Sequence, residues 1–213
     1  LMRFYDQVLE RTRAIPGVES AGAINVLPLG AGPTTGFRIE GRPIVSVDKW
    51  PHTNFRNVSP DYFRAMGIPL QRGRFFDVHD SADSQPVILI SRQLAERYWP
   101  GEDPVGKRLK IGPLDSPNAW LTVVGVVGNV RQAGLYGDPR MDLYVPYAQE
   151  RRVFMSPRDL VLRTKGDPAA VAGAAQLCDP GRIGAVDRDG QAGRARGRGP
   201  RRRATLRAPA GAG

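Results

Sequence analysis

The sequence changes character at Cys178, and this change limits how much of the chain can fold into a domain. Residues 178–213 contain no aromatic side chain, eight glycines, and nine arginines against three aspartates. A segment with so little apolar surface cannot offset the conformational entropy that folding costs. We therefore expect residues 1–177 to be folded and residues 178–213 to form a disordered, Arg/Gly-rich tail.

The tail also carries most of the positive charge, +6 of the formal net charge of +10. Its stretch "RARGRGPRRR" resembles an RNA-binding segment, so a nucleic-acid-binding module that acts through the tail is the alternative function. Arg, Gly, Ala and Pro are also the residues that GC-rich codons yield when they are read out of frame. The abrupt change inside a well-formed helix favours this out-of-frame interpretation.

Three further features bound the kind of protein. One cysteine excludes an internal disulfide. No run reaches the roughly 18 apolar residues that cross a bilayer, and the opening "LMRFYDQVLERTR" is charged too early for a signal peptide. Because the chain begins inside an amphipathic pattern, we expect it to be a piece of a longer protein.

Apolar periodicity predicts alternating helices and strands. Helices are expected over 1–15, over 60–66 with Ser59 as N-cap and Gly67 after the last turn, over 91–99, and after the N-cap Asp167. The mixture, with several β-α-β steps, predicts an α+β fold. Strands or extended segments are expected over 18–29, 37–43, 53–58, 68–76, 86–91, 107–112, 120–130, 143–147 and 160–165, with a loop over 30–36.

The block "NVSPDYFRAMGIPLQRGRFF", residues 57–76, interleaves aromatic and basic residues. Such a pattern is compatible with a nucleic-acid surface or with packing of a short helix between strands. Arg56, Arg64, Arg72 and Arg74 follow neither a helical stripe nor one strand face, which favours core packing.

The stretch "GEDPVGKR", residues 101–108, matches most of a phosphate-binding loop. Its last residue is Arg108, where a Ser or Thr is needed for Mg²⁺, and Glu102 and Asp103 bring negative charge to the phosphate position. The loop also leaves a helix and enters a strand, so no helix N-terminus faces the anion. We therefore interpret it as a turn.

No other motif predicts catalytic, metal or cofactor residues, and we expect none. "FFDVHDSAD" gathers Asp77, His79, Asp80 and Asp83, but it lacks the glycine and the glutamate of a calcium loop, so we interpret it as a solvated acidic loop. His52 has no obvious partner, Cys178 lies in the tail, and two histidines are too few to predict a catalytic triad.

Several phrases in order carry a family resemblance: "FYDQVLERTRAIPGVESAGAINVLPL", "NVSPDYFRAMGIPLQRGRFF", "PVILISRQLAERYWPGEDPVGKRLKIG", "WLTVVGVVGNVRQAGL", "LYVPYAQ" and "LVLRTKGDPAAVAGA". Together they resemble the MacB-like periplasmic core domain of ABC-transporter permeases in the MacB/FtsX superfamily. Within this superfamily they are most similar to a large permease group that is abundant in acidobacteria. The resemblance covers residues 1–177.

The resemblance implies a domain at the periplasmic face of the bacterial inner membrane, inserted between two transmembrane helices of a membrane protein. It implies a porter-like α/β subdomain, residues 1–80 and 155–177, with a smaller, mainly β, Sabre-like insert at about residues 81–150. The family pattern continues past Ala175 with a further strand, and we expect the tail to replace that strand.

The resemblance also implies a function without catalysis, in which the domain transmits an ATP-driven conformational change across the membrane to cargo or partner proteins. The helix from Leu1 would then act as a rigid lever continuing from the first transmembrane helix. The implied partners are the protein's own transmembrane helices, a cytoplasmic ATPase subunit, and a second permease in a homo- or heterodimer. No nucleic acid is expected as a partner, and no sequence pattern identifies the cargo.

Overall fold

The computed structural model describes most of the chain. The described residues are 2–28, 30, 32–43, 50–112, 116–130, 141–150, 155–178, 182–186 and 192–195.

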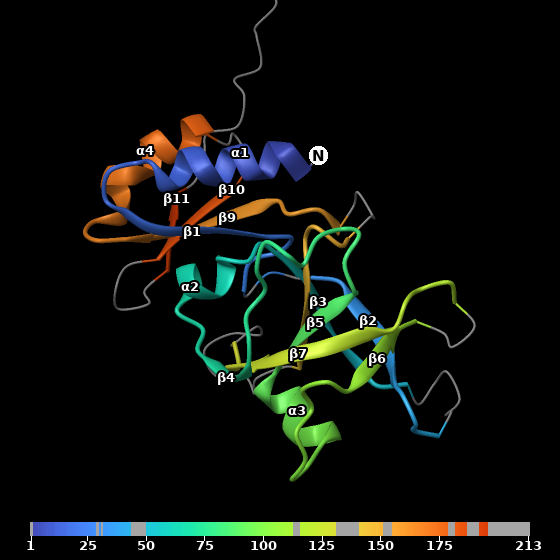
Figure 1. Cartoon of the computed structure of the whole chain (residues 1–213). Helices are drawn as coiled ribbons and strands as arrows, with labels where there is room; N and C mark the ends of the chain where they lie inside the picture. The colour runs from blue at the N-terminus through green and yellow to red at the C-terminus, as the bar shows by residue number, and fades with distance from the viewer. Residues whose placement is uncertain are drawn as a thin grey trace, which may run out of the picture.

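Four strands at one end of the molecule form an open sheet in the order β11-β10-β9-β1. The strand β1 (Val18–Ile24) is antiparallel to β9 (Asp159–Thr164), which is parallel to β10 (Arg182–Val186). The helices α1 (Met2–Arg13) and α4 (Pro168–Cys178) lie side by side over one face of this sheet (Figure 1). The helix α1 was predicted from its apolar periodicity, and α4 was predicted to follow the N-cap Asp167.

Two strands occupy part of the segment in which we expected disorder. Residues 182–186 form β10, and β11 (Ala192–Ala195) pairs with it in antiparallel fashion. The prediction of a disordered tail is therefore wrong for these stretches, because the free edge of β9 supplies backbone partners that composition alone does not reveal. The arginine-rich residues 196–203 lie outside the described residues.

Six other strands close into a ring, which we call the closed sheet. The ring is continuous with the open sheet, because β1 pairs with β3 (His52–Val58) through Ile24 and Val58. In the described part of the chain the order is β3-β2-β6-β7-β5-β8, and β8 pairs with β3 to complete the ring. The strand β4 (Leu70–Gly73) pairs with β7 outside the ring. The ring members are β2 (Thr34–Ile39), β3 (His52–Val58), β5 (Val87–Ser91), β6 (Arg108–Ile111), β7 (Leu121–Val127) and β8 (Asp142–Pro146).

The pairing differs from the predicted subdivision of the chain. We assigned residues 34–58 to the porter-like part and residues 81–150 to the insert, but β2 and β3 pair with β6 and β8. Strand pairing joins segments far apart in sequence, so the order of elements does not determine it. The α+β class agrees with the observed mixture of helices and strands. The names porter-like and Sabre-like stay predictions.

All six strands of the ring contribute side chains to its interior. Phe55 and Ile90 are examples, and the helix α3 (Arg92–Tyr98) adds Leu94 and, just after its end, Trp99. Because side chains alternate along a strand, Leu89 lies on the outer face of the ring, in a second apolar cluster. A third cluster packs α1 onto β1 and β9 through Val8, Leu9, Ala21, Ala23, Leu160 and Leu162.

Candidate functional site at the joint between the two sheets

The short helix α2 (Tyr62–Met66) lies between the open sheet and the closed sheet (Figure 1). Tyr62 and Phe63 are fully buried there, and the Phe63 ring stacks on Phe75 with centroids 5.4 Å apart. The Phe63 ring also meets the edge of Tyr144 from β8 at 5.1 Å. The aromatic residues of this segment therefore form core packing, as predicted, and we call this region the joint.

Backbone and side-chain hydrogen bonds connect β1 to β3 across the joint. The Ala23 N–H donates to Ser59 Oγ at 2.9 Å, and the Ser59 N–H donates back to the Ala23 carbonyl at 2.9 Å. Ser59 was predicted as the N-cap of α2, but that position is held by Asp61, which makes no side-chain cap bond. The prediction of Gly67 after the last turn is confirmed by its left-handed conformation, φ 68°.

The helix α2 approaches β1 closely enough to require a glycine. A Cβ on Gly22 would stand 2.5 Å from the Cα of Tyr62, which is far inside van der Waals contact. The absence of a side chain at Gly22 therefore lets the helix rest directly on the strand.

Charged and polar groups are buried beside the aromatic cluster. Arg56 on β3 and Asp142 on β8 are both almost fully buried, and Nε of Arg56 lies 3.8 Å from Oδ1 of Asp142. Asn54 donates to the same oxygen at 3.1 Å, and the Asp142 N–H donates to Ser91 Oγ at 3.1 Å. The β3–β8 pairing brings these residues together, because Asn54 is opposite Asp142 in the register.

Two buried phenols face this ion pair. Burial raises the pKa of Tyr144 and of Tyr62, and the nearby Asp142 carboxylate raises both further, so both hydroxyls are neutral. Neither hydroxyl has a hydrogen-bond partner among the described residues. A buried polar atom without a partner typically costs about 1–3 kcal/mol, so the joint holds polar groups that its present packing does not satisfy.

The first helix contacts both sheets at once. Tyr5 donates to the Pro157 carbonyl before β9 at 2.5 Å, and Arg13 forms an ion pair with Asp61 at the start of α2, 2.7 Å. The hydroxyl of Tyr147, just after β8, donates to Asp6. Burial and then the Asp6 carboxylate raise the pKa of Tyr147, so this donor stays protonated.

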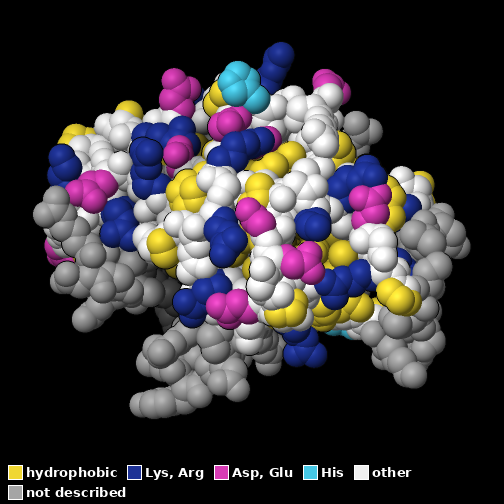
Figure 2. Space-filling view, turned by 60° about the horizontal axis from the view of Figure 1, so that its bottom comes forward, with side chains coloured by type: hydrophobic (Ala, Val, Ile, Leu, Met, Phe, Trp, Pro, Cys, Tyr) yellow, Lys and Arg dark blue, Asp and Glu magenta, His cyan; other side chains and the backbone are white. Residues whose placement is uncertain are grey.

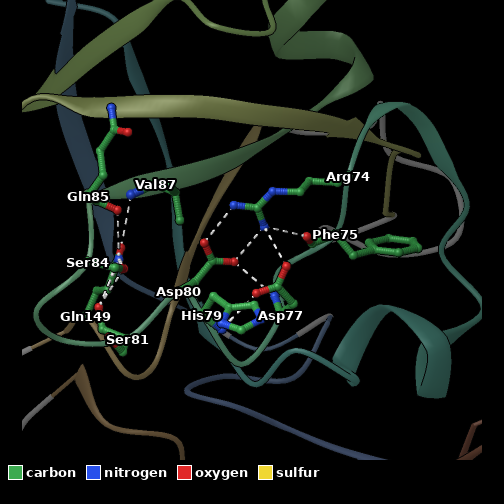
Figure 3. A network of polar contacts seen from close by, with 10 residues as sticks. All are labelled: Arg74, Phe75, Asp77, His79, Asp80, Ser81, Ser84, Gln85, Val87 and Gln149. Carbon is green, nitrogen blue, oxygen red and sulfur yellow. Dashed lines mark hydrogen bonds and ion pairs between the residues drawn. The ribbon is translucent and has the colours of Figure 1, made fainter.

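The acidic loop between β4 and β5 is organised around one buried carboxylate. Arg74 donates to both oxygens of Asp80, at 2.7 and 2.8 Å, and the Asp77 N–H donates to Asp80 at 2.9 Å (Figure 3). Asp77, His79 and Asp83 are exposed. The prediction of a solvated loop thus agrees with these three residues and is wrong for Asp80, which is 4% exposed because Arg74 folds over it.

Gln149 ties the same loop to the end of β8. Its Nε2 donates to the Ser81 carbonyl at 3.1 Å, to Ser84 Oγ at 2.9 Å and to the Gln85 carbonyl at 3.0 Å. Its Oε1 accepts from the Val87 N–H at 3.0 Å, as Figure 3 shows. One side chain therefore holds the entry into β5 in place.

The Asp80 contacts predict a pH dependence of stability. Burial alone would raise the pKa of Asp80, but the hydrogen bonds from Arg74 and Asp77 hold it below its usual value. A carboxyl whose folded pKa is lower than its unfolded pKa of about 4 stabilises the fold above that value and loses the contribution as pH falls. We expect Asp80→Asn to cost about 1 kcal/mol at pH 7 and to flatten the fall of Tm between pH 5 and 2.

The measurement is Tm against pH for the wild type and the variant. Asp77→Asn is the matched control, because Asp77 is half-exposed and lies 3.4 Å from Arg74. Equal acid sensitivity of the wild type and Asp80→Asn would contradict the assignment.

The remaining predicted motifs do not form a site. Residues 101–106 form the expected turn between α3 and β6, with Gly101 and Gly106 at positive φ and Lys107 paired with Glu102 at 3.5 Å. Within the described ranges, no three His, Cys, Asp or Glu residues are placed to hold a metal ion. Basic and acidic side chains are interspersed over the face that Figure 2 shows, which is not the pattern of a nucleic-acid surface.

Sequence reasoning did not find three residues of the joint: Arg56, Asp142 and Tyr147. A signal was present for the first two, because a charged residue within or beside an apolar strand requires a partner when it is buried. That partner is revealed only by the pairing of β3 with β8. No signal in the sequence relates Tyr147 to Asp6, which lies 141 positions away.

Comparison with known proteins gives consistent matches. The model of the MacB-like periplasmic core domain matches residues 3–177. Among curated proteins, the macrolide export ATP-binding/permease protein MacB of Neisseria gonorrhoeae is 30% identical over 90 residues. That match covers 42% of this chain and 13% of the relative's length, so the chain spans only a small part of such relatives. No described helix is long and apolar enough to cross a membrane.

Two solved structures share the fold. The periplasmic region of MacB from Actinobacillus actinomycetemcomitans superposes with a TM-score of 0.55 at 14% identity, over 80% of this chain and 70% of that one. The extracellular domain of the ABC-type transporter YknZ from Gram-positive bacteria superposes with a TM-score of 0.53 at 16% identity, over 80% of this chain and 76% of that one.

Proposed function

The chain belongs to the MacB-like periplasmic core domain family, and on that premise we propose that it transmits ATP-driven conformational change from the membrane to cargo or partner proteins. We place it at the periplasmic face of the inner membrane, as part of an ABC-type permease, and assign it no catalysis of its own. The transmembrane helices, a cytoplasmic ATPase and a second permease in a dimer are the partners that this role requires.

One observation carries the proposal: α1 contacts the open sheet, α2 and the closed sheet through separate polar contacts. Asp6 meets Tyr147 beyond β8, and Arg13 meets Asp61 at α2. The apolar face of α1 also packs onto β1 and β9. A displacement of this helix therefore acts on both sheets, as a rigid lever connected to a membrane helix would.

The buried polar groups of the joint support a movement of the two sheets relative to each other. Its aromatic packing is tight, but the hydroxyls of Tyr62 and Tyr144 are buried without a partner in the described part of the chain. A rearrangement that brings water or a polar group to them recovers part of their desolvation cost. Packed interfaces with two alternative arrangements convert small shifts into rigid-body rotations.

The test is a distance measurement in the full-length permease with its ATPase. Spin labels are attached at Glu10→Cys on α1 and Glu102→Cys beyond α3, both exposed positions, in a background without other cysteines. Double electron–electron resonance is recorded without nucleotide and with ATP held unhydrolysed. We expect the distance distribution between the labels to shift by several ångströms when ATP binds.

A second labelled pair serves as the control. Asp83→Cys and Glu96→Cys are exposed positions that both belong to the closed-sheet side of the molecule. Their distance should not change with ATP. If the first pair is equally insensitive to ATP while the ATPase is active, the transmission proposal is overturned.

A further inference from the structure

A groove at the far end of the closed sheet is independent of the joint. It has a volume of about 760 Å³ and lies beside β2, the start of β3 and the end of α3. No Asp or Glu is found among the described residues that line it. The side chains that give it its chemistry are Arg38, Arg42, Arg97, Trp50, Tyr98 and Trp120.

Arg38 is held over an aromatic ring inside the groove. Its guanidinium carbon lies 4.3 Å from the centroid of the Trp50 ring. Trp50 in turn packs on the backbone of β2, where a Cβ on Gly36 would stand 3.0 Å from the ring. Arg38 Nε is buried and has no hydrogen-bond partner in the described part of the chain. Stacking thus fixes the plane of a guanidinium with an unused donor.

The other two arginines are held in a similar way. Arg42 donates to the carbonyl of Tyr98, and its guanidinium carbon lies 5.8 Å from the Trp99 ring. Arg97 lies 5.9 Å from the Tyr98 ring. Arginines held against aromatic rings lose less freedom when they bind a ligand. The groove therefore presents cations whose positions are set in advance, next to aromatic surface.

We propose that this groove binds an acidic segment of another extracytoplasmic protein, in which apolar side chains alternate with carboxylates. A guanidinium fork pairs with a carboxylate through two parallel hydrogen bonds, and such bonds are stronger than those between neutral groups. Trp50, Tyr98 and Trp120 supply aromatic faces that can bury the intervening apolar side chains.

The positive charge of the groove favours an acidic segment over two other candidate occupants, the chain's own arginine-rich residues and a second copy of the chain. The chain's own residues 196–203 include five arginines and no acidic residue, so a basic groove repels them. Residues 1–177 of a second copy also carry a net positive charge, +4 of the formal +10, because the remaining +6 lies in residues 178–213. An acidic partner, in contrast, is attracted by the positive charge of the groove. Its binding does not depend on the transmission proposed above.

Binding can be measured by tryptophan fluorescence of the whole chain. Two of its three tryptophans line the groove, and the third, Trp99, is 3% exposed beneath Arg42. The probe is the synthetic peptide Glu-Leu-Glu-Phe-Glu-Leu-Glu, which contributes no tryptophan signal. We expect a saturable change in emission that weakens as NaCl rises from 50 to 500 mM.

Variants locate the site. Arg38→Glu and Arg97→Glu should each weaken peptide binding about tenfold or more, because each replaces an attraction by a repulsion. Arg92→Glu is the matched control on α3: Arg92 is exposed, does not line the groove, and should bind as the wild type does. Circular dichroism verifies that each variant is folded. If Arg38→Glu does not fold, the result for Arg97→Glu decides the outcome, because Arg97 is exposed.

Three outcomes would overturn the proposal. The first is equal binding of the peptide in which every Glu is replaced by Lys. The second is unchanged affinity in Arg97→Glu. The third is a fluorescence response to phosphatidylglycerol vesicles with none to the acidic peptide, which would identify a membrane surface instead.

Discussion

Phe63→Ala should lower the free energy of unfolding by about 3–5 kcal/mol, the usual cost of removing a buried phenylalanine. The ring is 1% exposed and packs between Phe75, Phe76 and Tyr144. Removing it leaves a cavity between the two sheets that the surrounding strands cannot close without breaking their pairing. Urea unfolding followed by circular dichroism measures the loss.

Phe4→Ala is the matched control for this prediction. Phe4 is 49% exposed on α1, so the same truncation should change the unfolding free energy much less. A cost below 1 kcal/mol for Phe63→Ala, with folding intact, would show that the joint does not depend on this ring.

Asp142→Ala should also cost about 3–5 kcal/mol, because it leaves Arg56 as a buried charge without its facing carboxylate. Asp142 is fully buried, and its Oδ1 lies 3.8 Å from Arg56 and accepts a hydrogen bond from Asn54. The substitution therefore also removes a polar partner from Asn54. The same urea titration measures this effect.

The double variant Arg56→Met, Asp142→Leu separates the charge effect from the packing effect. Replacing a buried pair by apolar residues of similar size is often neutral, so the double variant should be more stable than Asp142→Ala. Glu102→Ala, which breaks the exposed pair with Lys107, is the surface control and should change stability little. A double variant less stable than Asp142→Ala would contradict the role assigned to the pair.

Local structure was predicted well where neighbouring residues decide it. The helix predicted over 91–99 is observed as α3, Arg92–Tyr98. Gly67 ends α2 in the left-handed conformation, and the Ala169 N–H donates to Asp167 before α4. Each of these features depends on a few adjacent residues, so periodicity and capping patterns were sufficient to predict it.

Predictions failed where a distant segment supplies the partner. Ser59 has the properties of an N-cap, but its side chain accepts from Ala23, 36 positions away. Asp80 was expected in solvent and is instead covered by Arg74. Residues 182–186 have the composition of a disordered segment, yet they pair with β9. In each case a contact made by the fold outweighs the local preference.

The family was recognisable from the sequence through several phrases in order. The α+β class, the positions of most helices and the burial of the aromatic segment around Phe63 were predictable because they depend on patterns of apolar side chains that repeat over short distances. The folded structure was needed to show that β3 and β8 close a ring, that Arg56 meets Asp142, and that Arg38 stacks on Trp50 beside a groove. The reason is physical: hydrogen-bond pairing between strands depends on where the chain returns in space, which no local pattern encodes.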